Sequence, residues 1–169
     1  FRACGYNGVN IGQATGSAFF RPPLYNLDGD GELMDYEAKN IKVYRSVFVN
    51  IQNPIKFASS RGGGVYNCTF YCPIAYNEAD PTSLAFMYNM YSFQTSVGGY
   101  DLVWPRDGEV INNISYFNGS WGYENWIVMV QSATTMPETF LFSHNLWYNI
   151  ENPSSSEPDW ALLASQYGS

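Results

Sequence analysis

Four stretches of the chain repeat one pattern of apolar, polar and aromatic positions. Each begins with an apolar residue, has a polar residue two positions later and an aromatic residue five positions later, and ends on Asn or Cys. The four stretches are VYRSVFVN (43–50), VYNCTFYC (65–72), INNISYFN (111–118) and FSHNLWYN (142–149). A weaker copy, FMYNMYSF (86–93), lies between the second and the third, so successive copies begin 21 to 31 residues apart. Repeats of this length predict a solenoid, in which each unit stacks on its neighbours.

The copies have the composition of β-strands, because they are rich in Val, Phe, Tyr and Trp and are bounded by Gly, Asn, Pro or Ser. No segment keeps an apolar period of 3.6 residues for three turns, which disfavours a helical solenoid. We expect the aromatic column to stack in the interior, and the Asn column to lie where the chain turns, because Asn tolerates a left-handed backbone. The columns are Val43, Val65, Ile111 and Phe142; Arg45, Asn67, Asn113 and His144; Phe48, Phe70, Tyr116 and Trp147; and Asn50, Cys72, Asn118 and Asn149.

Three runs carry a resemblance to a known family. They resemble secreted right-handed parallel β-helix repeat proteins of the pectate-lyase-like superfamily. The run 40–71 is similar to the earlier coils of these proteins. The runs DGEVINNISYF (107–117) and PETFLFSHNLWYNIENP (137–153) are similar to the later coils. The resemblance covers about residues 36–153 and is more specific for fold than for function. It implies a superfamily of polysaccharide lyases, glycosidases, epimerases and adhesins.

The fold that follows is all-β: a right-handed parallel β-helix of about five to six coils with long loop excursions. We expect one domain over 1–169, with an N-terminal coil and loop (1–38), repeat coils (39–153) and a tail (154–169). Related chains continue into further coils after a segment like NLWYN. The sequence is therefore expected to be a piece of a longer coil, or to have an open end whose strand edge needs a cap or a contact with another protein chain.

The charge of the chain excludes some functions. The net charge is −7, and the eight Lys and Arg residues are spread along the chain, which argues against a nucleic-acid-binding protein. The acidic balance also argues mildly against a polyanionic substrate unless calcium bridges the two. No apolar run approaches the ~18 residues of a membrane span. The low charged fraction of 14%, the aromatic content and the resemblance favour a secreted or cell-surface protein, with the periplasm as an alternative.

Three cysteines cannot all pair with one another. Cys68 and Cys72 are about 13 Å apart on an extended strand, too far for a disulfide unless the chain turns between them. The favoured interpretation is buried free thiols, and a bond from Cys4 to one of them is the alternative.

The segment NLDGDGELMDYE (26–37) has the spacing of a calcium loop. Carboxylate and amide oxygens at positions 1, 3, 5 and 12 of such a loop are the ligands that calcium prefers. Pro22 and Pro23 stand where an entering helix would be, so a helix–loop–helix hand is not expected. The alternative is a Gly/Asp turn that links the N-terminal segment to the first coil. The candidate calcium ligands are Asn26, Asp28, Asp30, Glu32 and Glu37.

Two further segments interrupt the repeat at 94–109 and 119–137, and loops between the strands of a scaffold are the usual place for function. An aromatic ring beside carboxylates and an arginine is common in sugar sites. The alternative is that the aromatic rings of both segments fold back onto the core. Residues 125–131, in the second segment, are expected to form another strand. The substrate-binding candidates are Tyr100, Trp104, Trp121, Tyr123 and Glu124, and the catalytic candidates are Asp101, Arg106, Asp107 and Glu109.

The catalytic signatures of the resembled families are missing. The Asn-Thr-Asp, Asp-Asp and Gly-His-Gly motifs of polygalacturonases do not occur, and no arginine has the surroundings of the pectate-lyase arginine. The sole histidine, His144, occupies a repeat column, which favours a structural role. The sequence therefore predicts an extracellular carbohydrate-interacting β-helix, acting as a polysaccharide lyase or glycoside hydrolase if it is an enzyme. The alternatives are a non-catalytic structural, adhesion or polysaccharide-binding module, and a dockerin-like calcium loop that joins a larger assembly.

Overall fold

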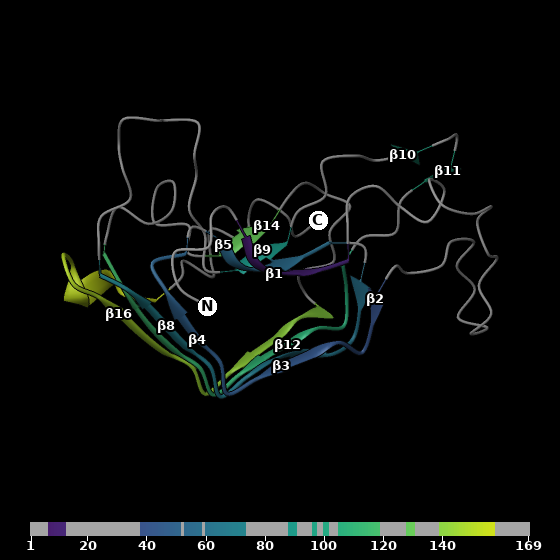
Figure 1. The fold of residues 1–169 in the computed structure, drawn as a ribbon. Coiled ribbons are helices and arrows are strands. Elements are labelled where there is room, and N and C mark those ends of the chain that lie inside the picture. Colours follow the sequence, from purple (N-terminus) through teal and green to yellow (C-terminus); the bar gives the residue numbers. More distant parts are fainter. Residues whose placement is uncertain are drawn as a thin grey trace.

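The structure is a computed structural model that describes residues 7–12, 38–51, 53–58, 60–73, 88–90, 96–97, 100–101, 105–118, 128–130 and 139–157 (Figure 1). Within these ranges the regular structure is β, apart from the short 3-10 helix η3 (Pro153–Ser155). No helix in these ranges is long and apolar enough to cross a membrane.

Most strands belong to three sheets of four strands each, which we name after one inner strand. The β7 sheet contains β3 (Lys42–Tyr44), β7 (Gly64–Tyr66), β12 (Glu109–Ile111) and β15 (Leu141–Ser143). The β8 sheet contains β4 (Val47–Val49), β8 (Thr69–Cys72), β13 (Ile114–Phe117) and β16 (Leu146–Asn149). The β5 sheet contains β1 (Asn7–Ile11), β5 (Asn53–Phe57), β9 (Tyr88–Met90) and β14 (Val128–Val130). Every strand pair within them is parallel.

Two smaller pairs complete the described strands. The strands β2 (Ala38–Lys39) and β6 (Ser60–Arg61) pair in parallel, and a further parallel bridge joins Arg61 to Arg106. The strands β10 (Ser96–Val97) and β11 (Tyr100–Asp101) pair antiparallel.

The chain runs from the β7 sheet directly into the β8 sheet four times, at β3–β4, β7–β8, β12–β13 and β15–β16. Figure 1 shows these two sheets meeting in a V, with the β5 sheet lying across its open side. This arrangement of stacked parallel strands is compatible with a β-helix. The described part shows four layers, whereas the sequence predicts five to six coils.

A left-handed residue makes each turn at the corner of the V. The four corner residues have φ between 46° and 56°, a region that Asn adopts more readily than most residues. They are Arg45, Asn67, Asn112 and His144. His144 lies at the corner of its layer, in the repeat column predicted from the sequence.

After two of the corners, at Asn112 and His144, the next residue is an asparagine whose side chain joins adjacent layers. Asn145 accepts hydrogen bonds at Oδ1 from the backbone and side-chain nitrogens of Asn113, at 3.0 and 3.1 Å, and donates to the carbonyl oxygen of Val110. Asn113 in turn accepts from the backbone N–H of Cys68 at 2.9 Å and donates to the carbonyl oxygen of Val65 at 3.0 Å. These side chains therefore satisfy backbone groups that the turn would otherwise bury without partners.

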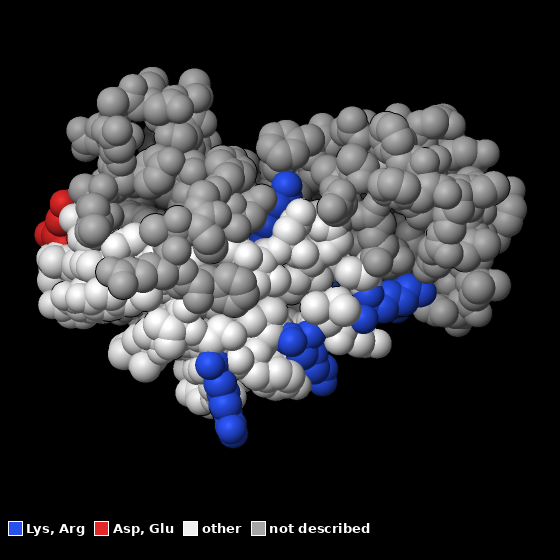
Figure 2. Space-filling view, in the orientation of Figure 1, with Lys and Arg blue, Asp and Glu red and all other residues white. Residues whose placement is uncertain are grey.

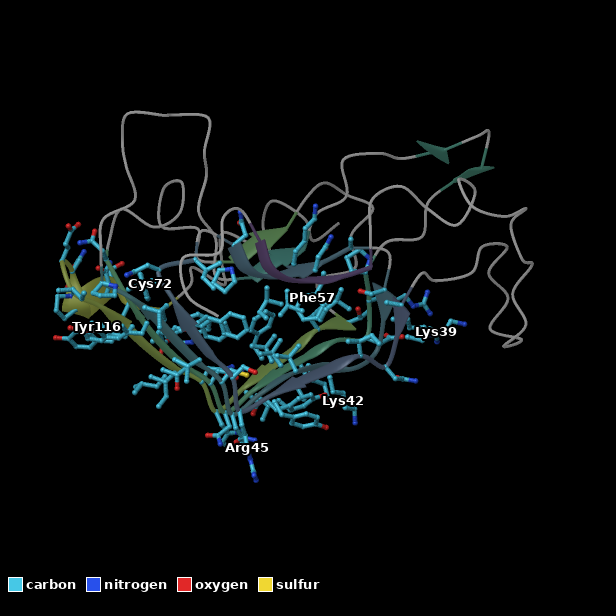
Figure 3. The ribbon with its side chains drawn as sticks, viewed as in Figure 1. Lys39, Lys42, Arg45, Phe57, Cys72 and Tyr116 are labelled. Atoms are coloured by element: carbon cyan, nitrogen blue, oxygen red, sulfur yellow. The ribbon has the colours of Figure 1, made fainter. Side chains whose placement is uncertain are left out.

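The core confirms the aromatic column in three of its four members. Phe48 and Phe70 stack at 5.0 Å between ring centroids, and both are fully buried, as is nearly all of Trp147. The prediction for Tyr116 is wrong: strand pairing places Ser115 between Phe70 and Trp147. Tyr116 lies on the outer face, whereas Phe57 points into the interior (Figure 3).

The cause is an error of one residue in the third copy. Val110, rather than Ile111, pairs with Val65 and Phe142, and Phe117, rather than Asn118, pairs with Cys72. A shift of one residue moves every side chain of a strand to the opposite face. The corner residue of this copy is accordingly Asn112 rather than Asn113.

The weak copy at 86–93 is also not part of these columns. Its strand β9 pairs with β5 and β14 in the β5 sheet. The strand predicted at 125–131 is confirmed by β14, which lies in the same sheet. The repeat therefore occurs once per layer, in four copies rather than five.

The Asn column behaves as expected at two of its positions. Asn50 has a φ of 50°, and Asn149 accepts hydrogen bonds at Oδ1 from the backbone N–H groups of Glu151 and Asn152. Cys68 and Cys72 are free and buried, which confirms the favoured interpretation, while Cys4 lies outside the described residues. Burial raises the pKa of both thiols, to about 11 for Cys72.

Candidate functional site

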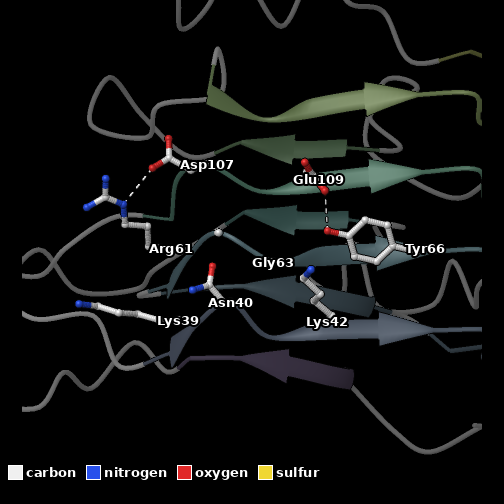
Figure 4. A pocket seen from close by; sticks show the side chains of 9 residues that line it. Lys39, Asn40, Lys42, Arg61, Gly63, Tyr66, Asp107 and Glu109 are labelled. Carbon is white, nitrogen blue, oxygen red and sulfur yellow. Dashed lines mark hydrogen bonds and ion pairs between the residues drawn. The ribbon is translucent and has the colours of Figure 1, made fainter. Parts of the chain in front are cut away.

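A depression of about 570 Å³ lies on the outer face of the β7 sheet, near the amino ends of its strands (Figure 4). Its side chains come from three successive layers of the stack. Apart from two glycines, every lining residue is polar or charged. The lining residues are Lys39, Asn40, Lys42, Arg61, Gly62, Gly63, Tyr66, Asp107 and Glu109.

Two glycines, Gly62 and Gly63, line the floor, and Gly64 follows them as the first residue of β7. At Gly63, with a φ of 75°, a Cβ atom would overlap the backbone of Ile41, and at Gly64 it would overlap the backbone of Glu109. Only glycine fits where backbones approach so closely. Gly64 is paired with Lys42 on one side and Glu109 on the other, so the outer face has a gap between these two charged residues. The lack of a side chain at Gly64 therefore leaves the positions of Lys42 and Glu109 on the outer face without a side chain between them.

A short hydrogen bond crosses the floor from Tyr66 to Glu109. The Tyr66 hydroxyl donates to the Glu109 Oε2 atom at 2.6 Å, and the Lys42 Nζ atom lies 5.9 Å from the centroid of the Tyr66 ring. Burial, and then the hydrogen bond to Glu109, raises the pKa of Tyr66 above its ordinary value. Tyr66 is therefore a protonated donor near neutral pH, and Glu109 is oriented by it.

Two guanidinium groups hold the second carboxylate. The Asp107 Oδ2 atom accepts from Arg61 Nε at 3.0 Å and from Arg106 Nε at 3.4 Å. Asp107 has a φ of 57°, and its backbone N–H donates to the Thr139 hydroxyl at 2.9 Å. The parallel bridge between Arg61 and Arg106 brings both arginines to the same carboxylate.

The charges are unevenly distributed over the depression. Figure 4 shows Lys39, Asn40 and Lys42 at one end and the two carboxylates at the other. A ligand that spans the depression meets strong donors at one end and strong acceptors at the other. Elsewhere, the Lys and Arg side chains visible in Figure 2 are separated from one another rather than gathered in a patch.

The structure brings together part of the predicted catalytic set. Asp107 and Glu109 line the depression, and Arg106, which is not among the lining residues, pairs with Asp107. Asp101 and Tyr100 lie in β11, where the backbone alone is described. The predicted substrate-binding residues Trp104, Trp121, Tyr123 and Glu124 lie outside the described residues.

The predicted calcium ligands also lie outside the described part of the chain, so the calcium prediction is untested; they are Asn26, Asp28, Asp30, Glu32 and Glu37. Among the residues that are described, no three or more His, Cys, Asp or Glu side chains form a group that could hold a metal ion.

The sequence did not identify the basic half of the depression. Tyr66 lies within a copy of the repeat, where we expected a structural position, Lys42 immediately precedes the first copy, and Arg61 lies between two copies. The Gly62–Gly64 run was the available signal, because three consecutive glycines next to a strand indicate a close approach of backbones.

Comparison with known proteins gives no match to a family model, a curated protein or a solved structure.

Proposed function

We propose that this chain forms a right-handed parallel β-helix that binds a polysaccharide in the depression over β3, β7 and β12. Parallel strands joined by crossovers are right-handed in nearly all known cases, which supports that hand for the stacked sheets. The observation that carries the binding proposal is the opposition of basic and acidic side chains across a glycine floor. Lys42 and Glu109 are the pair nearest that floor, one on each side of Gly64.

Carbohydrates suit this arrangement because each sugar carries several hydroxyl groups that donate and accept hydrogen bonds. Lysine and arginine supply donors, and the carboxylates supply acceptors, in charge-assisted hydrogen bonds. The Tyr66 ring adds an apolar surface with a polar tip, as is common in sites that bind partly polar ligands. An apolar small molecule is disfavoured, because such ligands bind in pockets lined mainly by hydrophobic side chains.

The carboxylates Asp107 and Glu109 are the groups on which chain cleavage would depend. Hydrolysis of a glycosidic bond requires two carboxyl groups on either side of it, and elimination requires a base. Tyr66 is held protonated and is not that base. Asp107 is neutralised by two arginines, so Glu109 is the better candidate for proton transfer.

The test is incubation with a panel of neutral and acidic polysaccharides, with and without calcium, scoring retention and chain shortening. We expect retention of at least one polymer. Lys42→Gln and Glu109→Gln should each weaken retention by about tenfold, the usual effect of losing one charge-assisted hydrogen bond. Arg45→Gln is the matched control, because Arg45 is exposed at the corner and outside the depression.

The outcomes separate the functions. Shortening of a retained polymer that Glu109→Gln abolishes would indicate an enzyme, and an unsaturated product would indicate a lyase. Retention without shortening would indicate a binding module. If no polymer is retained, or if Arg45→Gln weakens retention as much as Lys42→Gln, the proposal is wrong. If retention requires calcium, that result would support the calcium loop predicted at 26–37. It would also support the secreted or cell-surface location that we propose.

The second candidate function is a structural or adhesion module in a larger assembly. The observation that favours it is the apolar outer face of the β8 sheet, on which several large hydrophobic side chains are about half exposed.

A further inference from the structure

The outer face of the β8 sheet carries two rows of uncharged side chains. Strand register aligns one row of mostly aliphatic residues and one row that contains three tyrosines. The rows are Val47, Thr69, Ile114 and Leu146, and Val49, Tyr71, Tyr116 and Tyr148. In Figure 2 the surface over β4, β8 and β16 is free of charged side chains.

These side chains are unusually exposed for their type. Leu146 is 59% exposed, Ile114 47% and Val47 52%. A contiguous exposed apolar patch often marks an interaction surface, whereas single exposed apolar residues scattered over a surface do not.

The tyrosine row disfavours a sugar as the ligand of this face. Tyr116 stacks on Tyr71 at 5.3 Å and on Tyr148 at 5.4 Å, with interplanar angles of 12° and 5°. Neighbouring rings therefore cover both faces of Tyr116 and leave ring edges and hydroxyl groups outward. A pyranose ring that needs an open aromatic face finds none at Tyr116.

We propose that a second copy of this chain packs on this face, sheet against sheet. Rows of side chains that repeat at one strand spacing, about 4.8 Å, interdigitate well with a surface of the same repeat. A second copy has that repeat in every layer. An isologous pair, in which the same face is used by both partners, is the commonest form of homodimer.

The area of the face decides how strong such a dimer is. Half-exposed side chains in these two rows offer roughly 500 Å², given about 150–250 Å² for one aromatic side chain. Two copies then bury roughly 1,000 Å², the lower limit for a specific interface. The dimer is therefore expected to be weak and reversible, with a dissociation constant on the order of 10 to 100 μM.

Charge gives the dimer an identifiable salt dependence. Each chain carries a net charge of −7, whereas the face itself is uncharged. Two copies repel each other at low ionic strength, and salt screens that repulsion. Dimerisation should therefore strengthen as salt is added, unlike an association that depends on opposite charges.

The test is sedimentation equilibrium of the whole chain from about 10 μM to 1 mM, at low and at physiological salt. The average mass should rise from the 19.1 kDa of one chain towards twice that value, more steeply at higher salt. Leu146→Lys should weaken the dimer at least about tenfold, because dimerisation would bury the added charge. Ile114→Lys, on the neighbouring strand β13, should do the same.

Leu141→Lys is the matched control, since Leu141 is 51% exposed on the outer face of the β7 sheet. It should leave the mass profile unchanged, and thermal melts should confirm that all three variants are folded. A monomer at every concentration overturns the proposal, as does a dimer that Leu141→Lys weakens as much as Leu146→Lys. The proposal is also overturned if no dimer forms and Leu146→Lys abolishes retention on a neutral polysaccharide. That result would assign the face to a glycan. Polysaccharide retention through the depression should be the same in Leu146→Lys as in the unmodified chain.

Discussion

The buried amide of Asn113 offers a direct test of how the layers are joined. Asn113 is 1% exposed, and its side chain makes three hydrogen bonds: from the Cys68 N–H, to the Val65 carbonyl and to the Asn145 Oδ1. Truncation in Asn113→Ala removes all three. It leaves the buried N–H of Cys68 without this acceptor.

The size of the effect follows from these contacts. Each lost hydrogen bond costs about 1 kcal/mol net, and a buried N–H left without a partner costs a further ~1–3 kcal/mol. These contributions are not fully additive, because the lost Cys68 hydrogen bond is counted in both. We therefore expect a loss of about 3 to 4 kcal/mol in the free energy of unfolding. This is a large share of the ~5–15 kcal/mol by which a protein is normally stable.

The assay is urea unfolding followed by tryptophan fluorescence, with Asn112→Gly as the matched control. Asn112 is exposed, bonds to Asn67 and has a φ of 56°, which glycine adopts without strain. That variant should change the free energy of unfolding by less than about 1 kcal/mol. If Asn113→Ala is no more destabilising than Asn112→Gly, the amide does not join the layers and the corrected register is wrong.

A second substitution at the same position separates hydrogen bonding from packing. In Asn113→Asp the side chain keeps its shape and the oxygen that accepts from the Cys68 N–H. Its second oxygen, which is charged, replaces the NH2 group and faces the carbonyl oxygen of Val65 and the Oδ1 atom of Asn145. We expect it to be as unstable as Asn113→Ala at neutral pH and to regain stability in acid, because a protonated carboxyl group can donate where the amide did. A flat dependence on pH would contradict this account.

Two other stability predictions follow from the core. Ser115→Ala should leave stability unchanged or raise it by about 1 kcal/mol in urea unfolding, because the buried Ser115 hydroxyl has no hydrogen-bond partner among the described residues; a loss above about 1 kcal/mol would indicate a partner. Burial raises the pKa of the Cys72 thiol from 9.0 to about 11, so its contribution to stability is fully present below pH 9 and is lost as the pH rises towards 11. Cys72→Ala should therefore flatten the fall in stability between pH 9 and 11, and an equally steep fall in that variant would rule out this thiol as a cause.

The sequence identified the strands because each copy combines apolar spacing with bounding turn residues. Val43, Val65 and Phe142 fall in one column, and so do Phe48 and Phe70 in another, as the pattern predicted. The number of layers was predicted less well. The segment around β9 has the same strand-like composition as the true copies, and composition alone does not say which sheet a strand joins.

The candidate site could be predicted only in part, because its two halves are distant in the sequence. Asp107 and Glu109 stood out as charged residues in a segment that interrupts the repeat. Lys42 and Tyr66 come from the two preceding layers and reach the same depression as Glu109 only because the strands stack in register. The repeat aligns Lys42 with Gly64, but the one-residue error in the third copy places Val110 rather than Glu109 beside them.

The error in the third copy shows which signal sets the register of such a stack. Asn112 and Asn113 both tolerate the left-handed corner, so the aromatic Tyr116 decided the alignment, although Ser115 occupies the core position. The second copy indicates the correct choice, because its exposed corner residue Asn67 is followed by the buried Cys68. In the third copy, the hydrogen bonds of the buried Asn113 agree with the observed register, whereas the aromatic residue five positions into the copy does not. A register wrong by one residue turns an outward tyrosine into a core residue, and the exposed tyrosine row of the β8 sheet cannot be predicted until the corner has been placed.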